Sequence, residues 1–320
     1  MKTLRIISLL LIPLLLPQCE KNETLEPDVE WTFYAAKDGL VSNNVNDLAF
    51  GPDGALWVGT EFGVSRFDGQ TWQSFNVPQG LIHHEVTSIA VSADNTVWMG
   101  TPFGLSRLRN GEWQNYNTSN GLAYNYVYDV AVDAQNRPWV ATGFGVNHFD
   151  GQSWIHLQKV NGSALVHNIV RSVGIDNDQY KWFGTEFGVS RYRGGSWQTF
   201  LANENQASFV VSLYHDKLSR VWFGNLIGVT LYNGQSFVNY TMNDGLAFNR
   251  VNAITEDNNN RMYFGTPGGL SVFNGSTWKN FTTSNKLPDN WITSLATDSE
   301  GRVWIGTKSK GIAVIKIKKM

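Results

Sequence analysis

Few residues of this chain could carry out chemistry, and the first group is a set of histidines beside a glutamate. His83, His84 and Glu85 are consecutive, and His167 lies in a second loop. An imidazole next to a carboxylate can act as a general acid or base, or assist a metal ion. These side chains come from separate loops, however, with no nucleophile motif and no metal-ligand spacing. We therefore expect no catalytic residues, no metal and no cofactor, and a lyase or hydrolase ranks third among our hypotheses.

A second group of residues suits recognition rather than catalysis. Tyr126, Arg250 and Trp291 occupy corresponding positions in three loops, and each directly follows an asparagine. An aromatic plane beside amide and charged groups can stack on a sugar ring and hydrogen-bond to its hydroxyl groups. The same mixture is typical of a surface that binds another protein. Both hypotheses depend on which elements place these loops together.

Those elements are seven copies of one repeat. The segment LWVGTEFGV, residues 56–64, returns six times at intervals of 40 to 43 residues, for example as VWMGTPFGL and KWFGTEFGV. A repeat of this length indicates a propeller or a solenoid, and the strand-rich composition favours a propeller. The marker aromatic residues of the seven copies are Trp57, Trp98, Trp139, Trp182, Trp222, Tyr263 and Trp304.

Each copy predicts four short strands, called a to d in chain order. In the second copy these are VTSIAV, TVWMGT, GLSRLR and EWQNY. Asp-Gly or Asn-Gly pairs such as Asp68-Gly69 separate c from d and predict tight turns, because both residue types tolerate positive φ. Acidic a-to-b turns such as DSEGRVW lack the run of oxygen ligands that a calcium loop supplies. The repeated aromatic residues are expected to pack between neighbouring blades.

The first strand of the domain is expected to complete its last blade. Strand d carries an aromatic residue followed three positions later by a large apolar one, as in Trp72 and Phe75. Trp31 and Tyr34 show this pattern before the first copy, whereas the seventh copy has no room for its own strand d. The fold class is therefore all-β: a single seven-bladed β-propeller of four-stranded antiparallel blades, closed by a strand at about residues 31–34.

A binding site is expected on the face where the copies differ. In such a blade the d-to-a and b-to-c connections share one face, which we call the variable face. Two residues stand just before each strand a, for example Asn125 and Tyr126 before the third. The first of the two is usually Asn, which favours a turn-stabilising role over a ring of ligand-binding amides. The second varies between copies. The predicted ligand-binding residues are Asn44, Phe62, His84, Glu85, Phe103, Tyr126, Phe144, His167, Phe187, Arg250 and Trp291.

Two loops on this face are irregular. The segment QKVNGSALVHN before the fourth blade is two residues longer than its counterparts, and LANENQASF before the fifth is one residue shorter. Asn225 also replaces the repeated threonine in the fifth blade. Local drift and a specialised side of the face explain these departures equally well.

The N-terminus predicts export and a lipid anchor. Lys2 and Arg5 precede an apolar run, residues 6–16, that is too short to cross a bilayer. The only cysteine, Cys19, follows this run, as in a bacterial lipoprotein signal; an ordinary signal peptide is the alternative. We expect a signal peptide at 1–18, an acidic tether at 19–30 from lipidated Cys19, and the propeller at 31–320. The protein should lie in the cell envelope, on the periplasmic side of the outer membrane or at the cell surface.

The repeat resembles the two-component regulator propeller repeats, on the pattern GL-x-x-N-x-V through D-x-x-G-x-V-W-x-GT-x-x-G-V-S. That resemblance implies a ligand-sensing propeller of the kind found outside the membrane in hybrid histidine kinases, with polysaccharide breakdown products as a known ligand class. No membrane-spanning helix or kinase region follows the repeats in this sequence. We therefore expect a non-catalytic monomer that binds a small glycan or another polar ligand. The alternative is a scaffold for an envelope protein, and the net charge of −2 argues against nucleic acid.

Overall fold

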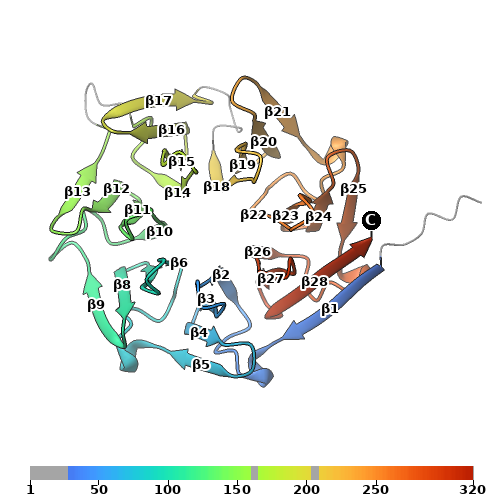
Figure 1. Cartoon of the computed structure of the whole chain (residues 1–320), viewed down its shortest axis with the longest axis horizontal. Helices are drawn as coiled ribbons and strands as arrows, with labels where there is room; N and C mark the ends of the chain where they lie inside the picture. The colour runs from blue at the N-terminus through green and yellow to red at the C-terminus, as the bar shows by residue number, and fades with distance from the viewer. Residues whose placement is uncertain (1–27, 160–164, 203–208, 320) are drawn as a thin grey trace, which may run out of the picture.

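The computed structural model of the chain describes residues 28–159, 165–202 and 209–319. The strands form seven four-stranded antiparallel sheets arranged in a ring (Figure 1). Each sheet is one blade, with strand a innermost and strand d outermost. This is the seven-bladed propeller that the repeat predicts. The predicted signal peptide and Cys19 lie outside the described residues.

The strands of the seven blades follow the predicted order. Blades 1 and 2 contain β2 (Val45–Phe50), β3 (Leu56–Thr60), β4 (Gly63–Phe67), β5 (Trp72–Phe75), β6 (Ser88–Val91), β7 (Val97–Thr101), β8 (Gly104–Arg109) and β9 (Glu112–Tyr116). Blades 3 and 4 contain β10 (Val127–Val132), β11 (Pro138–Thr142), β12 (Gly145–Phe149), β13 (Trp154–Leu157), β14 (Val170–Ile175), β15 (Lys181–Thr185), β16 (Gly188–Arg193) and β17 (Ser196–Phe200). Blades 5 and 6 contain β18 (Val210–His215), β19 (Val221–Asn225), β20 (Val229–Tyr232), β21 (Phe237–Tyr240), β22 (Ala253–Glu256), β23 (Met262–Thr266), β24 (Gly269–Phe273) and β25 (Trp278–Phe281). Blade 7 contains β26 (Ile292–Thr297), β27 (Val303–Thr307), β28 (Ile312–Lys319) and β1 (Asp28–Tyr34).

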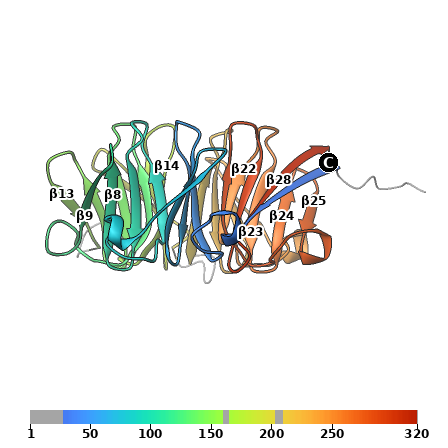
Figure 2. The ribbon, with the colours of Figure 1, turned by 90° about the horizontal axis from the view of Figure 1, so that it is seen from below.

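The N-terminal strand closes the ring as expected. β1 pairs antiparallel with β28 in the outermost position of blade 7, with Trp31 opposite Ile315 and Tyr34 opposite Ile312. The two strands lie side by side in both ribbon views (Figures 1 and 2). β1 begins at Asp28, three residues before the predicted boundary, so residues 28–30 are part of the strand. Trp31 packs edge-on against Phe281 of blade 6, with 5.6 Å between ring centroids.

The core lies between neighbouring blades, where the repeated aromatic residues pack. All five residues of each strand b are buried, from β3 to β27. In blade 5 the Trp222 indole N–H donates to Asp216 in the a-to-b turn at 2.8 Å, and Arg220 forms an ion pair with the same carboxylate. Blade 7 repeats this arrangement with Asp298 and Trp304. The acidic residues of these turns therefore bond to the tryptophan and arginine of their own blade.

The connections between strands gather at the two faces of the disc (Figure 2). On one face the c-to-d turns have positive φ at Gly69, Gly111 and Gly234, as the Asp-Gly and Asn-Gly pairs predict. On the other face, four d-to-a connections each contain a short 3-10 helix: η1 (Ala36–Asp38), η2 (Val77–Gln79), η4 (Met242–Asp244) and η5 (Thr283–Asn285). Within the part of the chain that the structure describes, no helix is long and apolar enough to span a membrane.

Candidate functional site

The two faces differ sharply in the aromatic side chains that they expose. Nine aromatic residues are exposed among those described, and seven of them lie on the variable face. The other two, Phe33 and Phe237, lie on outer strands. On the opposite face Leu218 is the single large apolar side chain that the described residues expose. The seven on the variable face are Phe62, Phe103, Tyr124, Phe144, Phe187, Phe248 and Trp291.

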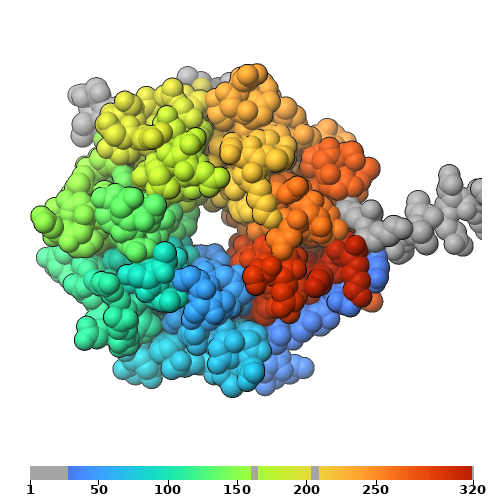
Figure 3. Space-filling model, in the orientation of Figure 1, coloured from blue at the N-terminus to red at the C-terminus, as the bar shows by residue number. Residues whose placement is uncertain are grey.

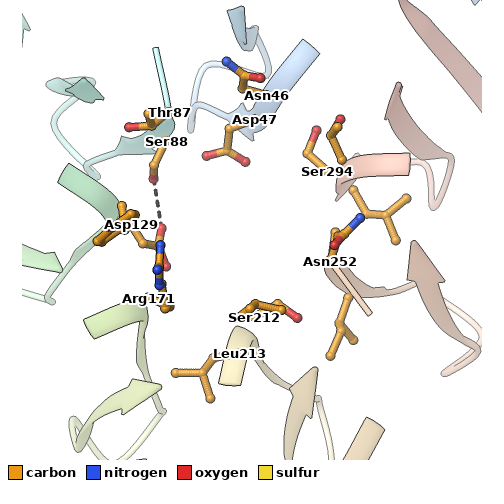
Figure 4. A pocket seen from close by; sticks show the side chains of 16 residues that line it. Asn46, Asp47, Thr87, Ser88, Asp129, Arg171, Ser212, Leu213, Asn252 and Ser294 are labelled. Atoms are coloured by element: carbon orange, nitrogen blue, oxygen red, sulfur yellow. Dashed lines mark hydrogen bonds between the residues drawn. The ribbon is translucent and has the colours of Figure 1, made fainter. Parts of the chain in front are cut away.

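The centre of the variable face opens into a channel, which is visible in the space-filling view (Figure 3). A cavity of about 260 Å³ lies there, between the first residues of the innermost strands. Its lining is mostly polar, with Asn46, Thr87, Asn252 and Ser294 among the side chains drawn around it in Figure 4. Such a cavity can offer a ligand several hydrogen-bond donors and acceptors at once.

Two carboxylates in the cavity connect neighbouring blades. Asp47 of blade 1 accepts hydrogen bonds from the backbone N–H groups of Leu48 and of Ile89 in blade 2. Asp129 of blade 3 accepts from Val173 N–H in blade 4, and the Ser88 hydroxyl of blade 2 donates to it at 2.9 Å (Figure 4). Burial raises the pKa of Asp47 to about 7, with a further contribution from the nearby Asp129, and burial raises the pKa of Asp129 to about 6.

Arg171 is the one cationic side chain among the residues that line this cavity. Its guanidinium lies 4.1 Å from the centroid of the Tyr128 ring and 5.7 Å from that of Phe209, and it forms an ion pair with Glu186. The Tyr126 ring, predicted as a ligand contact, lies 4.6 Å from that of Tyr128. Aromatic rings and a guanidinium therefore meet at the rim of the cavity, on blades 3 to 5.

A second concentration of rings lies on blades 1 and 2. The Phe62 and His84 centroids are 6.2 Å apart, those of His84 and His83 4.1 Å, and those of His83 and Phe103 4.6 Å. Phe62 and Phe103 are 57% and 59% exposed. We call these four residues the blade 1–2 strip. Phe62, His84 and Phe103 were predicted from sequence as ligand contacts, and the structure joins them through His83 into one series of neighbouring rings.

Sequence reasoning missed one set of residues on this face. The residue before the repeated asparagine contacts the b-to-c turn of the blade that it enters: Tyr124 lies over Gly143, and Phe248 over Gly268. Both side chains are exposed. The signal was present, since this position also varies between copies, but its direction depends on a turn about 20 residues away.

The other predicted contacts are distributed around the face. The Asn44 side-chain amide donates to Glu61 at 2.8 Å, so part of its capacity is already used. His167 lies 4.6 Å from Phe187, centroid to centroid, in blade 4. The Arg250 guanidinium is exposed and donates to Asn252, which lines the cavity. Glu85 is half-buried, whereas Phe144 and Trp291 are exposed.

The repeated asparagine has the structural role that the sequence favours. In five loops its side-chain oxygen accepts a hydrogen bond from an earlier backbone N–H, seven residues before it in four loops and nine residues before it in the longer loop that contains Asn168. The asparagines are Asn43, Asn125, Asn168, Asn249 and Asn290. Thr60 and its equivalents likewise bond within the b-to-c turn. In blade 5, Asn225 keeps the bond to the turn N–H, at Ile227, so this departure preserves the scaffold.

The histidines do not converge into a reaction centre. His83 and His84 belong to the loop that enters blade 2, and His167 to the loop that enters blade 4. The Glu85 backbone N–H donates to His83 Nδ1, and burial together with the neighbouring His84 lowers the pKa of His83. No group of three or more His, Cys, Asp and Glu side chains suited to a metal ion occurs in residues 28–159, 165–202 and 209–319.

Comparison with protein families identifies the repeat. Three segments match the family model described as two component regulator propeller: residues 39–62, 245–268 and 286–309. Each covers a d-to-a loop, strands a and b and the start of the b-to-c turn. The chain thus carries two-component regulator propeller repeats, as the resemblance predicts. No curated protein matches the chain significantly.

Solved structures with the same fold have different roles. The extracellular domain of a hybrid two component system from B. thetaiotaomicron matches with a TM-score of 0.77 and 20% identity. The match covers 90% of this chain but only 42% of that domain. Virginiamycin B lyase from Staphylococcus aureus matches with a TM-score of 0.75 and 13% identity, over 91% of this chain and 100% of that one. PorZ, a surface component of the type-IX secretion system of Porphyromonas gingivalis, matches with a TM-score of 0.71 and 19% identity. The match covers 88% of this chain and 48% of PorZ. At these identities the likeness concerns the fold.

Proposed function

We propose that this chain, which carries two-component regulator propeller repeats, is an exported, non-catalytic propeller that binds a glycan fragment on its variable face. The carrying observation is the gathering of seven of nine exposed aromatic residues on that face, around a polar cavity. Exposed aromatic side chains concentrated on one face of a protein commonly mark a binding surface. Rings that stack on a sugar, beside polar groups that bond to its hydroxyls, favour a glycan over a purely apolar ligand.

Two further features of the proposal come from its context. The fold is shared with the extracellular domain of a two component system, which supports a sensing or presenting role outside the membrane. Lipidation of Cys19 would hold the propeller at the envelope. The absence of a convergent acid–base group among the described residues supports a binding protein rather than an enzyme.

The test is a binding measurement on the purified protein with a panel of glycans, followed by two variants. Trp291→Ala and Tyr124→Ala should each weaken glycan binding about five- to tenfold, because each removes an exposed ring on the variable face. Leu218→Ala is the matched control, since Leu218 is a large apolar residue that is 59% exposed, more than Trp291 or Tyr124, but lies on the opposite face, so its loss should leave affinity unchanged. Absence of binding to every glycan tested would contradict the proposal.

The second candidate function is a scaffold for a protein of the cell envelope, and the same exposed aromatic residues support it. The fold is also that of PorZ, a surface component of a secretion system. Co-purification of an envelope protein that Phe144→Ala abolishes, together with no glycan binding, would favour this function. Turnover of a substrate that both His84→Ala and His167→Ala abolish would instead favour a lyase, the fold's role in virginiamycin B lyase.

A further inference from the structure

The loop that enters blade 2 departs from a rule that five other loops follow. In those five loops an asparagine closes the turn by accepting a hydrogen bond from an earlier backbone N–H, seven residues before it in four loops and nine residues before it in the longer loop that contains Asn168. His84 occupies this position in blade 2, where the corresponding N–H belongs to Val77. The scaffold thus gives up at this loop a hydrogen bond that five other loops keep. A departure from a local rule that the rest of the fold follows points to a function.

His84 gains ring contacts in exchange for that bond. It stands between Phe62 of the preceding blade and His83, and His83 stacks on Phe103 of its own blade. The blade 1–2 strip therefore runs without interruption across the boundary between two blades. Phe62, His84 and Phe103 are all exposed. Four neighbouring rings offer more stacking surface than a single sugar ring can cover, so they suit a ligand that contacts several of them at once.

The charges beside the strip indicate which ligand it fits. Glu61 and Glu85 are its immediate sequence neighbours, and both are acidic. An anionic chain would be repelled by these carboxylates. The His83 Nδ1 atom accepts from Glu85 N–H, which in the neutral ring leaves the proton on Nε2 as a hydrogen-bond donor. Aromatic rings with polar edges suit a chain that has both apolar C–H surfaces and hydroxyl groups.

We infer that the blade 1–2 strip is a subsite for an extended, uncharged oligosaccharide. This inference rests on the proposed function and specifies its ligand: a neutral glycan of several residues that lies across blades 1 and 2. Affinity should therefore rise with chain length from one to about four sugar residues. Tyr126 and Trp291 lie in loops of other blades, so their replacement should not remove the dependence of affinity on chain length, whereas changes in the strip should.

The decisive variant is His84→Asn, which restores the asparagine that five other loops carry. We expect it to fold at least as stably as the parent protein, because the turn regains its hydrogen bond to Val77. Its affinity for a neutral tetrasaccharide should fall about five- to tenfold, since one ring of the strip is lost. Its affinity for the monosaccharide should stay unchanged. Phe103→Ala should show the same pattern, and Leu218→Ala should behave as the parent.

The measurement is isothermal titration calorimetry with neutral β-linked glucan oligosaccharides of one to six residues, and with oligogalacturonides as acidic chains of similar length. The inference is supported if the parent binds longer neutral chains more tightly and if this increase in affinity with length is reduced in both variants. Equal length dependence in parent, His84→Asn and Phe103→Ala overturns it and leaves the proposed function standing. Binding of the acidic series alone also overturns it, again without affecting the proposed function. A parent protein that binds neither series overturns the inference, and absence of binding to the wider glycan panel overturns the function as well.

Discussion

Asp47 and Asp129 face the channel, where their carboxylates hold the innermost strands of neighbouring blades together. Both have a pKa raised by burial, to about 7 and about 6, above the ordinary value of 3.8. A carboxyl group whose pKa is raised in the folded protein stabilises the fold fully below about pH 4. That stability is lost as the pH rises through the folded-state pKa.

Replacing Asp47 by Asn should therefore stabilise the protein at pH 8. The amide oxygen can still accept a backbone hydrogen bond, but no charge has to be buried. We expect the free energy of unfolding at pH 8 to rise by about 1–3 kcal/mol. The dependence of stability on pH between 4 and 7 should become weaker, as measured by denaturant unfolding across that range.

Asp68 provides a control of opposite sign. It lies in an exposed turn, where hydrogen bonds from Thr71 and Gln70 backbone N–H groups lower its pKa to about 2. Its carboxylate therefore stabilises the fold above about pH 4. Asp68→Asn should reduce stability at pH 7, and a gain there would contradict the electrostatic account of both residues.

At the scale of the secondary-structure element, the a-to-b turn of blade 2 lacks a partner that other blades possess. Ser92 stands where blades 3 to 7 have an aspartate. As a result, the Trp98 indole N–H and the Ser92 hydroxyl are both buried without a hydrogen-bond partner. Blade 4 shows that the aspartate functions without a neighbouring arginine, since Asp176 accepts from Trp182 Nε1 and from Tyr180 N–H.

Ser92→Asp should consequently stabilise the protein. The new carboxylate can accept from Trp98 Nε1, which removes a buried unsatisfied donor, and the Arg107 guanidinium lies 5.6 Å from the Trp98 ring centroid. We expect the free energy of unfolding to rise by about 1 kcal/mol, and the melting temperature by about 2 °C. Differential scanning calorimetry would detect this shift. Ser92→Ala is the control. It supplies no acceptor for the Trp98 N–H, so it should give no gain in unfolding free energy from that group.

The elements were largely predictable from sequence because each copy repeats the same local pattern. β8 and β9 have the residues expected of GLSRLR and EWQNY, and the closing strand was recognised from the spacing of Trp31 and Tyr34. The direction of loop side chains was not predictable in the same way. Tyr124 points over Gly143 because of a contact between a loop and a turn that the sequence separates. Stacking of His84 between Phe62 and His83 likewise depends on two blades meeting.

At the scale of the whole molecule, the ring depends on β1. Each of blades 1 to 6 takes its four strands from one continuous segment, whereas blade 7 combines β26, β27 and β28 with the first strand of the chain. Tyr34 stacks on Trp304 at 5.4 Å and contacts Trp72 at 5.8 Å, so it joins blade 7 to blade 1. Opening this connection would leave an unpaired β28 edge and expose the core between blades 6, 7 and 1.

A chain that begins after Tyr34 should therefore lose both stability and cooperativity. The chain beginning at Asp28 is the matched control, because it keeps all seven residues of β1. We expect the shorter chain to unfold at a lower urea concentration and over a broader range, since blades that contact only their neighbours can unfold separately once the ring is open. Trp31→Ala should lie between the two, with a loss of about 3 kcal/mol from the packing against Phe281. Equal midpoints and slopes for the two chain lengths would mean that the other six blades hold the ring without its closing strand.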